Sequence, residues 1–119
     1  MRYLVLAVEA PSAFEDREDD ERSDGYWQTW RGYLEALTAA GVLVDAGGLQ
    51  PPTTATTVRL VDGRQQVQDG PFADTKEQLG GYFVLEVADL DDALGWASRC
   101  PSVHAGGSCE VRPLLPPRR

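Results

Sequence analysis

The hydrophobic pattern of the chain begins with a nearly continuous apolar run. Residues 2–8 are apolar almost throughout, which predicts a strand covered on both faces by the rest of the chain or by a partner subunit. Farther on, large apolar side chains recur at i, i+4, i+7, i+8 and i+11, the spacing of one face of an α-helix. They are Tyr26, Trp30, Tyr33, Leu34 and Leu37. Ser23 or Asp24 can cap the start of this helix, and Gly41 stands where it should end.

The middle of the chain has the pattern of strands and tight turns. Residues 42–49 predict a second strand, which Pro51 and Pro52 stop. Residues 56–61 and 64–69 flank Asp62-Gly63, a strong two-residue hairpin signal. The second arm of this hairpin is polar, so we expect it at an edge.

The last third repeats the strand–helix–strand order. A strand is expected at 82–87, and Asp89 can cap a second helix whose apolar face carries Leu90, Ala93, Leu94 and Ala97. This helix should end near Arg99 because Pro101 follows. Residues 101–107 are expected to form a Gly-rich loop before a last strand at 108–115.

This element order predicts one α+β domain over residues 1–119, a ferredoxin-like split βαβ arrangement with an inserted hairpin. Two helices can cover only one face of such a sheet, yet the central strands carry apolar residues on both faces. We therefore expect a homodimer in which two sheets pack face to face.

Charge narrows the classes of partner. The net charge of −8 opposes binding to nucleic acids and to anionic membranes, and no apolar run approaches the ~20 residues of a membrane span. Eight acidic residues and two arginines lie between Glu9 and Asp24. We interpret this segment as a solvated loop, with docking of a basic protein partner as the alternative.

Few residues are available for metal or redox chemistry. Cys100 and Cys109 are too few for a disulfide framework, and the N-terminus does not have the pattern of a signal peptide, so we expect reduced thiols in the cytoplasm. A redox pair is the alternative. His104 is the single histidine, and no residue cluster has metal-ligand spacing. Neither a metal nor another cofactor is expected.

The connection after the hairpin is dense in turn residues. Asp69-Gly70-Pro71-Phe72 begins it, and Asp74 and Glu77 have the spacing of a capping box, which predicts a short helical turn from Thr75. Gly80-Gly81 would then lead into the next strand.

These residues carry a family resemblance. Asp69-Gly70-Pro71-Phe72, together with the segments 41–44, 48–52, 88–93 and 110–113, resembles the DGPF branch of the YCII-related family over nearly the whole chain. The resemblance implies a dimeric α/β-barrel-like assembly and a family whose biochemical role is largely unassigned. It also implies association with extracytoplasmic-function sigma factors through gene neighbourhood.

Two residues are candidates for acid–base chemistry. Asp69 can act as a general base at a strand end, or it can be a turn former that accepts backbone hydrogen bonds. His104 can shuttle protons from its loop, or its place there can be incidental. In the wider family, a His on the first helix and an Asp before Pro are the suggested active pair. The matching positions here are Trp30 and Cys100, so the resemblance does not supply that pair.

Five residues are candidates for ligand binding. Trp30, Phe72 and Tyr82, with Trp27, would suit an apolar ring, and Lys76 or Arg112 would hold an anion. The structural alternatives are core packing for Phe72, simple exposure for Lys76 and an ion pair with Glu110 for Arg112.

Two functions follow from these observations. The first is a small-molecule-binding or regulatory accessory protein linked to sigma-factor pathways, with a regulatory protein as a further partner. The alternative is a cofactor-free lyase or isomerase that acts on a small cyclic or aromatic substrate.

Overall fold

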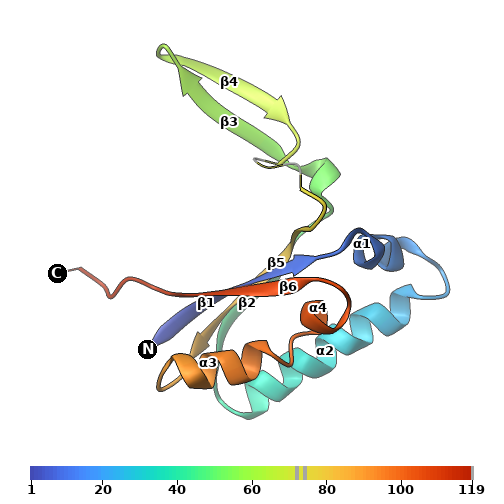
Figure 1. Ribbon diagram of the computed structural model, residues 1–119, viewed down its shortest axis with the longest axis vertical. Helices are drawn as coiled ribbons and strands as arrows, with labels where there is room; N and C mark the ends of the chain where they lie inside the picture. The colour runs from blue at the N-terminus through green and yellow to red at the C-terminus, as the bar shows by residue number, and fades with distance from the viewer. Residues whose placement is uncertain (72, 74, 119) are drawn as a thin grey trace.

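A four-stranded antiparallel sheet forms the body of the protein in the computed structural model, which describes residues 1–71, 73 and 75–118 (Figure 1). Its strands are β1 (Arg2–Glu9), β2 (Leu43–Gly48), β5 (Gln78–Glu86) and β6 (Ser108–Pro113), in the order β2-β5-β1-β6. Helices α2 (Ser23–Ala39) and α3 (Leu90–Ala97) cover one face. This is the ferredoxin-like order, and the predicted α+β class is confirmed.

The core lies between this face and the helices. Every second residue of β1 is buried there, beginning at Tyr3, and Phe83 and Leu85 of β5 lie beside them in register. From α2, the Tyr33 ring meets Phe83 edge to face, with 5.6 Å between ring centroids. Tyr33 also donates a hydrogen bond to the Trp96 carbonyl, 2.7 Å away, which fixes α2 against α3.

The opposite face of the sheet is apolar along β1 and β5, and no helix of the described chain covers it. Leu4 and Leu6 of β1 pair with Val84 and Tyr82 of β5, and all four side chains are only half-buried. The sequence pattern that indicated two apolar faces thus corresponds to one face under the helices and one open face. We define the open face by Leu4, Leu6, Val8, Tyr82 and Val84.

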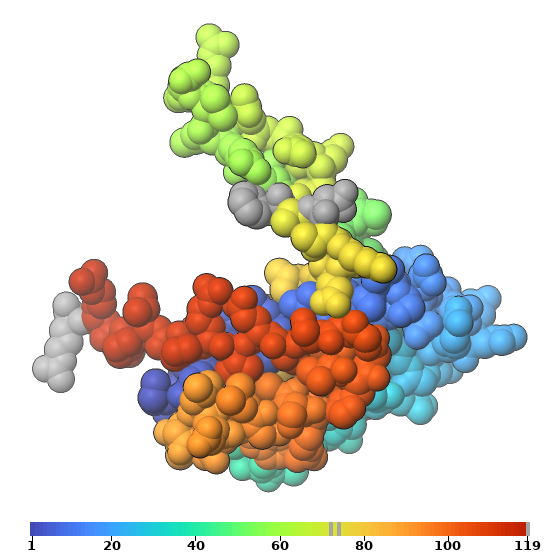
Figure 2. All heavy atoms as spheres, in the orientation of Figure 1, coloured from blue at the N-terminus to red at the C-terminus, as the bar shows by residue number. Residues whose placement is uncertain are grey.

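The hairpin forms where the sequence predicts it. β3 (Thr56–Val61) and β4 (Arg64–Asp69) pair with each other in a separate two-stranded sheet, which a short 3-10 turn, η1 (Pro52–Thr54), precedes. Asp62 and Gly63 have φ of 51° and 76°, the positive values that a tight primed turn requires. The hairpin projects from the body on the side away from the helices (Figures 1 and 2).

Three local predictions were wrong. The acidic segment is not a loop throughout: α1 (Pro11–Glu18) occupies its first half, with Pro11 at the first turn and Ala13 buried, and only residues 20–22 form an exposed turn. The expected loop at 101–107 begins with a single helical turn, α4 (Pro101–His104). No helical turn begins at Thr75. Residues 75–77 are irregular and β5 begins at Gln78, while Asp74 of the expected capping box lies outside the described residues.

Helix ends follow the sequence more closely at α3 than at α2. The Asp89 carboxylate caps α3 by accepting a hydrogen bond from the Asp92 amide at 2.9 Å, as predicted. Gly41 follows α2 with φ of 73°, also as predicted. Neither Ser23 nor Asp24 caps the start of α2. The preceding turn is instead held by Asp19, which accepts from two backbone amides. Within the described residues, no helix is long and apolar enough to cross a membrane.

Candidate functional site

A cavity of about 720 Å³ lies between α2 and the sheet edge formed by β2 and β5. Its helix wall contains Trp27, Trp30, Arg31 and Leu34, which recur at helical spacing on one side of α2. Its sheet wall consists of short segments of β2 and β5, residues 46–48 and 80–83.

Glycines leave this space open. Gly47 and Gly48 on β2 and Gly80 and Gly81 on β5 put bare backbone opposite the aromatic helix wall. A methyl group added at Gly48 would meet no atom within 4 Å, so this position opens onto empty space. At Gly80, by contrast, it would collide with the Glu9 carboxylate, so a glycine is required there.

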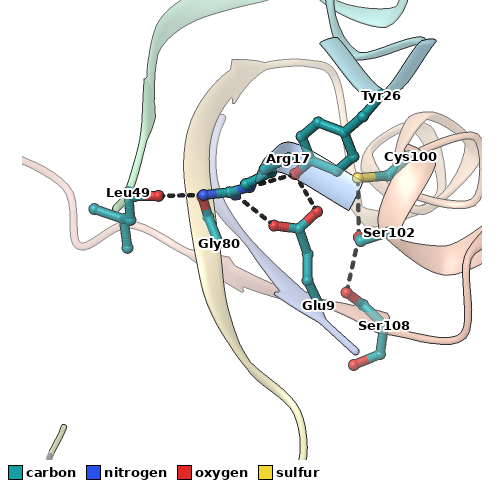
Figure 3. Close-up of polar contacts among 8 residues, drawn as sticks. All are labelled: Glu9, Arg17, Tyr26, Leu49, Gly80, Cys100, Ser102 and Ser108. Carbon is teal, nitrogen blue, oxygen red and sulfur yellow. Dashed lines mark hydrogen bonds and ion pairs between the residues drawn. The ribbon is translucent and has the colours of Figure 1, made fainter. Parts of the chain in front are cut away.

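A buried ion cluster forms one end of the cavity (Figure 3). Glu9 ends β1 on the helix-covered side, where its side chain is 1% exposed, and Arg17 of α1 is 7% exposed. Arg17 Nη2 donates to Glu9 Oε2 at 2.7 Å, and its Nε donates to the Tyr26 hydroxyl at 3.0 Å. The Tyr26 hydroxyl in turn donates to Glu9 Oε1. The cluster closes on itself, as a buried ion pair needs if its desolvation is to be offset.

Arg17 also ties together distant parts of the chain. It donates to the carbonyls of Leu49, at 2.6 Å, and Gly80, at 2.9 Å, at the two roots of the hairpin. Its guanidinium lies 4.8–5.3 Å from the ring centroids of Phe14, Tyr26 and Trp27. Four of its five N–H groups therefore have acceptors among the described residues and one has none, and Arg17 as a whole lines the cavity.

The electrostatics of the cluster keep Tyr26 protonated. Burial raises the pKa of Tyr26 above its ordinary value of 10.0, and the hydrogen bond to the Glu9 carboxylate raises that pKa further. A carboxylate and a guanidinium in contact leave the cluster with no net charge. What this end of the cavity offers a ligand is a phenol and a guanidinium, both held in fixed positions.

The structure brings together two of the seven candidate residues from the sequence. Trp30 and Tyr82 both line the cavity, with Trp27; Trp30 lies on the helix wall, whereas Tyr82 borders the cavity from β5 and its ring lies over Gly47 on the open-face side of the sheet. Phe72 lies outside the described residues. The remaining four are exposed and lie elsewhere.

Each of those four has a local explanation for its place. Asp69 ends β4 and is carried away from the body by the hairpin, and Lys76 lies in the irregular connection that follows. Arg112 pairs with Glu110 at 2.8 Å on the same side of β6, the structural alternative that their spacing allowed. His104 is the last residue of α4, and its Nε2 donates a hydrogen bond to the Ser98 carbonyl at 2.8 Å. Neither Asp69 nor His104 lines the cavity.

Sequence reasoning missed Glu9, Arg17 and Tyr26 as site residues. No local pattern marks Glu9, because residues 2–8 are apolar on both faces of the strand and only the fold shows that Glu9 shares the buried side of β1 with Tyr3, Val5 and Ala7. Tyr26 lies on the predicted apolar face of the helix, but no sequence pattern predicts the contact of its hydroxyl group. Arg17 lies in a segment whose charge predicts a solvated loop and not a buried ion pair.

The two cysteines share a hydroxyl. Ser102 Oγ lies 3.3 Å from Cys100 Sγ and 3.4 Å from Cys109 Sγ, and it donates to the Ser108 carbonyl. Hydrogen bonds from Cys109 and Ser102 lower the pKa of the buried Cys100 thiol. The hydrogen bond to Cys100 and burial raise the pKa of Cys109. Both thiols are free, and a redox role for them stays a prediction.

Among the described residues, no group of three or more His, Cys, Asp or Glu could hold a metal ion.

Comparisons with known proteins place the chain in a family and support the fold. Residues 1–117 match the family model described as the YCII-related domain. An uncharacterized protein of Rhizobium meliloti (strain 1021) is 39% identical over 118 residues, which cover 96% of this chain and 92% of that protein.

One solved structure is similar over nearly its whole length. It is the 5-chloro-2-hydroxyhydroquinone dehydrochlorinase of Burkholderia phenoliruptrix AC1100 in complex with 2,5-dihydroxybenzoquinone. The TM-score is 0.56 at 18% identity, with 97% of this chain and 94% of that chain covered. At this identity, the likeness shows a shared fold.

Proposed function

Because the chain belongs to the YCII-related family, we propose that it binds a small molecule in the cavity between α2 and strands β2 and β5. The observation that carries this proposal is the cavity itself, with Trp27 and Trp30 on one wall and glycine backbone on the other. Its volume of about 720 Å³ and its aromatic lining are typical of small-molecule sites.

The walls favour a planar ring with an ionised oxygen substituent. A flat ring fits between the two indoles and the glycine backbone. Larger residues in place of these glycines would exclude the ring. Arg17 keeps one N–H without an acceptor among the described residues, and it suits an oxygen atom of the ligand. Arg31 lies on the same wall with no ion pair to another described residue, and it suits a negative charge. The dihydroxybenzoquinone bound by the dehydrochlorinase of similar fold belongs to this class.

Titration calorimetry tests the ligand class. We expect 2,5-dihydroxybenzoquinone or 4-hydroxybenzoate to bind with a Kd below roughly 100 μM, and cyclohexanecarboxylate and benzyl alcohol to bind at least tenfold more weakly. Arg31→Ala should weaken binding of the planar anions about tenfold, the effect of one charge-assisted hydrogen bond. Equal binding of all four compounds, or of none across a broader panel of planar anions, would contradict the proposal.

Filling the cavity tests its location. Gly48→Val places two methyl groups in space that is empty, so the protein should fold and the ligand should be excluded. Gly95→Val is the matched control, because Gly95 on α3 also opens onto empty space but lies outside the cavity. Tryptophan fluorescence adds a second readout, since Trp96 lies outside the cavity and packs on Arg99 instead. Ligand-induced fluorescence changes should survive Trp96→Phe and be lost only when both Trp27 and Trp30 are replaced by Phe.

A lyase or isomerase acting on such a ring is the second candidate function. The observation that favours it is the Tyr26 hydroxyl, held between Glu9 and Arg17 at the cavity wall. There the Tyr26 oxygen can accept a proton from one atom of the ligand while its own proton passes to the Glu9 carboxylate, and the reverse transfer returns a proton to another atom of the ligand. Asp69 and His104 are not part of this candidate, because they lie outside the cavity. Tyr26→Phe should then abolish turnover and leave the Kd within about threefold; unchanged turnover would exclude the role.

We also propose that the protein is a cytoplasmic homodimer whose open faces pack together. The support is the apolar open face, which no element of the described chain covers. A regulatory role beside a sigma factor is part of the same proposal and rests on the family resemblance. Light scattering at micromolar concentration tests the dimer, and a mass near 13.0 kDa would contradict it. Copurification with a sigma factor tests the regulatory role, and its absence at matched expression would count against that role.

A further inference from the structure

The projecting hairpin has one apolar face that nothing in the described chain covers. Val58 and Leu60 of β3 point to the same side, and Val67 of β4 lies directly opposite Val58. Their exposed fractions are 56%, 76% and 62%. We call this surface the arm face. The other side of the hairpin is mostly polar, with Thr57, Gln66 and Gln68.

An isolated hairpin of this kind is not stable by itself. β3 and β4 pair only with each other, and the space-filling view shows them standing clear of the body (Figure 2). Two-stranded hairpins are marginal in water and need a further strand, a helix or another packed surface. An exposed apolar ribbon also promotes aggregation, and proteins normally cover such a surface or place charged residues on it. The arm face therefore calls for a packing partner.

The total surface area of the chain is larger than that of a compact monomer. The chain exposes 8226 Å², whereas a compact monomer of 13.0 kDa exposes about 6,300 Å². The surplus of about 1,900 Å² is more than twice the roughly 800 Å² that each partner buries in a standard interface, and it falls within the range of obligate dimers. The radius of gyration, 16.1 Å, likewise exceeds the roughly 13.5 Å of a compact domain of this length.

The occupant that these features favour is a second copy of this chain. The hairpin projects on the side of the sheet away from the helices, which is the side of the open face, so a two-fold axis can bring each arm against the sheet of the other copy (Figure 1). Charge does not oppose this arrangement at β6, because the exposed Glu110 and Arg112 neutralise each other there at 2.8 Å. Val58, Leu60 and Val67 on the arm, and the apolar residues of the open face beside this ion pair, supply apolar contacts of the kind found in obligate homodimer interfaces.

We propose that β3–β4 is an exchanged arm whose face of Val58, Leu60 and Val67 packs on the second copy of the chain. The arm extends the contact beyond the sheets and becomes ordered by it. This inference rests on the proposed homodimer, and it adds a separate element to that dimer. Dimerisation by the sheets alone would leave the arm face exposed, so the two statements can fail separately.

Charge substitutions on the two sides of one hairpin test the arm. The double variant Val58→Lys with Leu60→Lys should weaken dimerisation at least 100-fold in sedimentation equilibrium, because two charges would be buried in an apolar contact. Gln66→Lys is the matched control: it adds the same residue on the polar side and should shift the dimer constant less than threefold. All three positions are exposed in the single chain, so the subunits should fold, and circular dichroism verifies it.

The outcomes separate the arm from the dimer. If the dimer dissociation constant of the double variant is within threefold of that of the unaltered protein, the proposed arm contact is wrong and the sheet-mediated dimer is unaffected. An unaltered protein that is monomeric at 100 μM overturns both. Hydrogen exchange gives an independent reading: amides of 56–61 and 64–69 should exchange at least tenfold more slowly in the dimer than in the double variant. Equal exchange would overturn the arm whatever the oligomeric state.

Discussion

The side chain of Arg17 connects β1, α2 and the base of the hairpin. It neutralises Glu9, orients Tyr26 and holds the carbonyls at both hairpin roots. No local pattern marks either Glu9 or its partner, because the strand before Glu9 is apolar on both faces. Arg17 is eight residues from Glu9, 32 from Leu49 and 63 from Gly80 in sequence, so its role depends on tertiary contacts that periodicity does not report.

Removing the Arg17 guanidinium should destabilise the protein strongly. Arg17→Met leaves Glu9 buried without its counter-ion, which costs about 3–5 kcal/mol in the free energy of unfolding. Arg17→Lys keeps the charge but loses the fork, and an intermediate loss is expected. Arg22→Met is the control, because its ion pairs with Asp16 and Asp19 are exposed and worth at most about 1 kcal/mol. Urea denaturation measures all three, and equal losses at Arg17 and Arg22 would contradict the buried cluster.

Tyr33 should make the fold sensitive to alkaline pH. Burial raises the pKa of Tyr33 above 10.0, with the charges of Cys100 and Cys109 adding to the shift. Above pH 10 the unfolded chain loses this proton and the folded chain keeps it, so stability is full below pH 10 and falls as pH rises further. The slope from this group approaches about 1.4 kcal/mol per pH unit. Chemical denaturation between pH 8 and 11.5 should show a shallower decline in Tyr33→Phe, and identical declines would exclude this cause.

At the scale of elements, the sequence predicted the elements whose signals are local. The bounds of β3 and β4 match the structure because Asp62-Gly63 fixes the turn and the register of both strands. α1 was missed because its apolar residues are few and its acids many, and because its stability depends on Arg17 reaching the core. The sequence predicts one wall of the cavity, because the helix pattern places Trp30 on the apolar face of α2. It does not predict the other wall, which depends on glycines of β2 and β5 that come together only in the fold.

The cap of α3 provides a test at this scale. Asp89→Ala removes the acceptor for the Asp92 amide and should lower the free energy of unfolding by about 1 kcal/mol. Asp91 lies two residues further on, in the first turn of α3, and makes no hydrogen bond to the backbone in the described chain. Asp91→Ala should therefore change the free energy of unfolding by less than about 0.5 kcal/mol. Thermal denaturation of both variants measures the difference. Equal effects would mean that helix charge, and not the cap, is what Asp89 contributes.

At the scale of the whole molecule, the predicted homodimer and the projecting arm make stability depend on concentration. If folding and dimerisation are coupled, dilution favours the unfolded monomers by mass action. A 100-fold rise in protein concentration is worth about 2.7 kcal/mol per dimer, and with the unfolding entropy of two such chains it should raise Tm by about 5 °C. Differential scanning calorimetry from 2 to 200 μM, roughly that 100-fold span, measures the shift.

The same scans distinguish the arm from the sheets. In the double variant Val58→Lys with Leu60→Lys, the arm no longer contributes to the dimer. Its Tm should therefore be lower at each protein concentration, and a higher concentration should be needed to reach the Tm of the unaltered protein. Gln66→Lys should follow the unaltered protein at every concentration. A Tm that stays within 1 °C over the whole range in the unaltered protein, by the same mass-action argument, would mean that each subunit folds alone. The large exposed surface of 8226 Å² would then belong to a monomer that tolerates an uncovered arm.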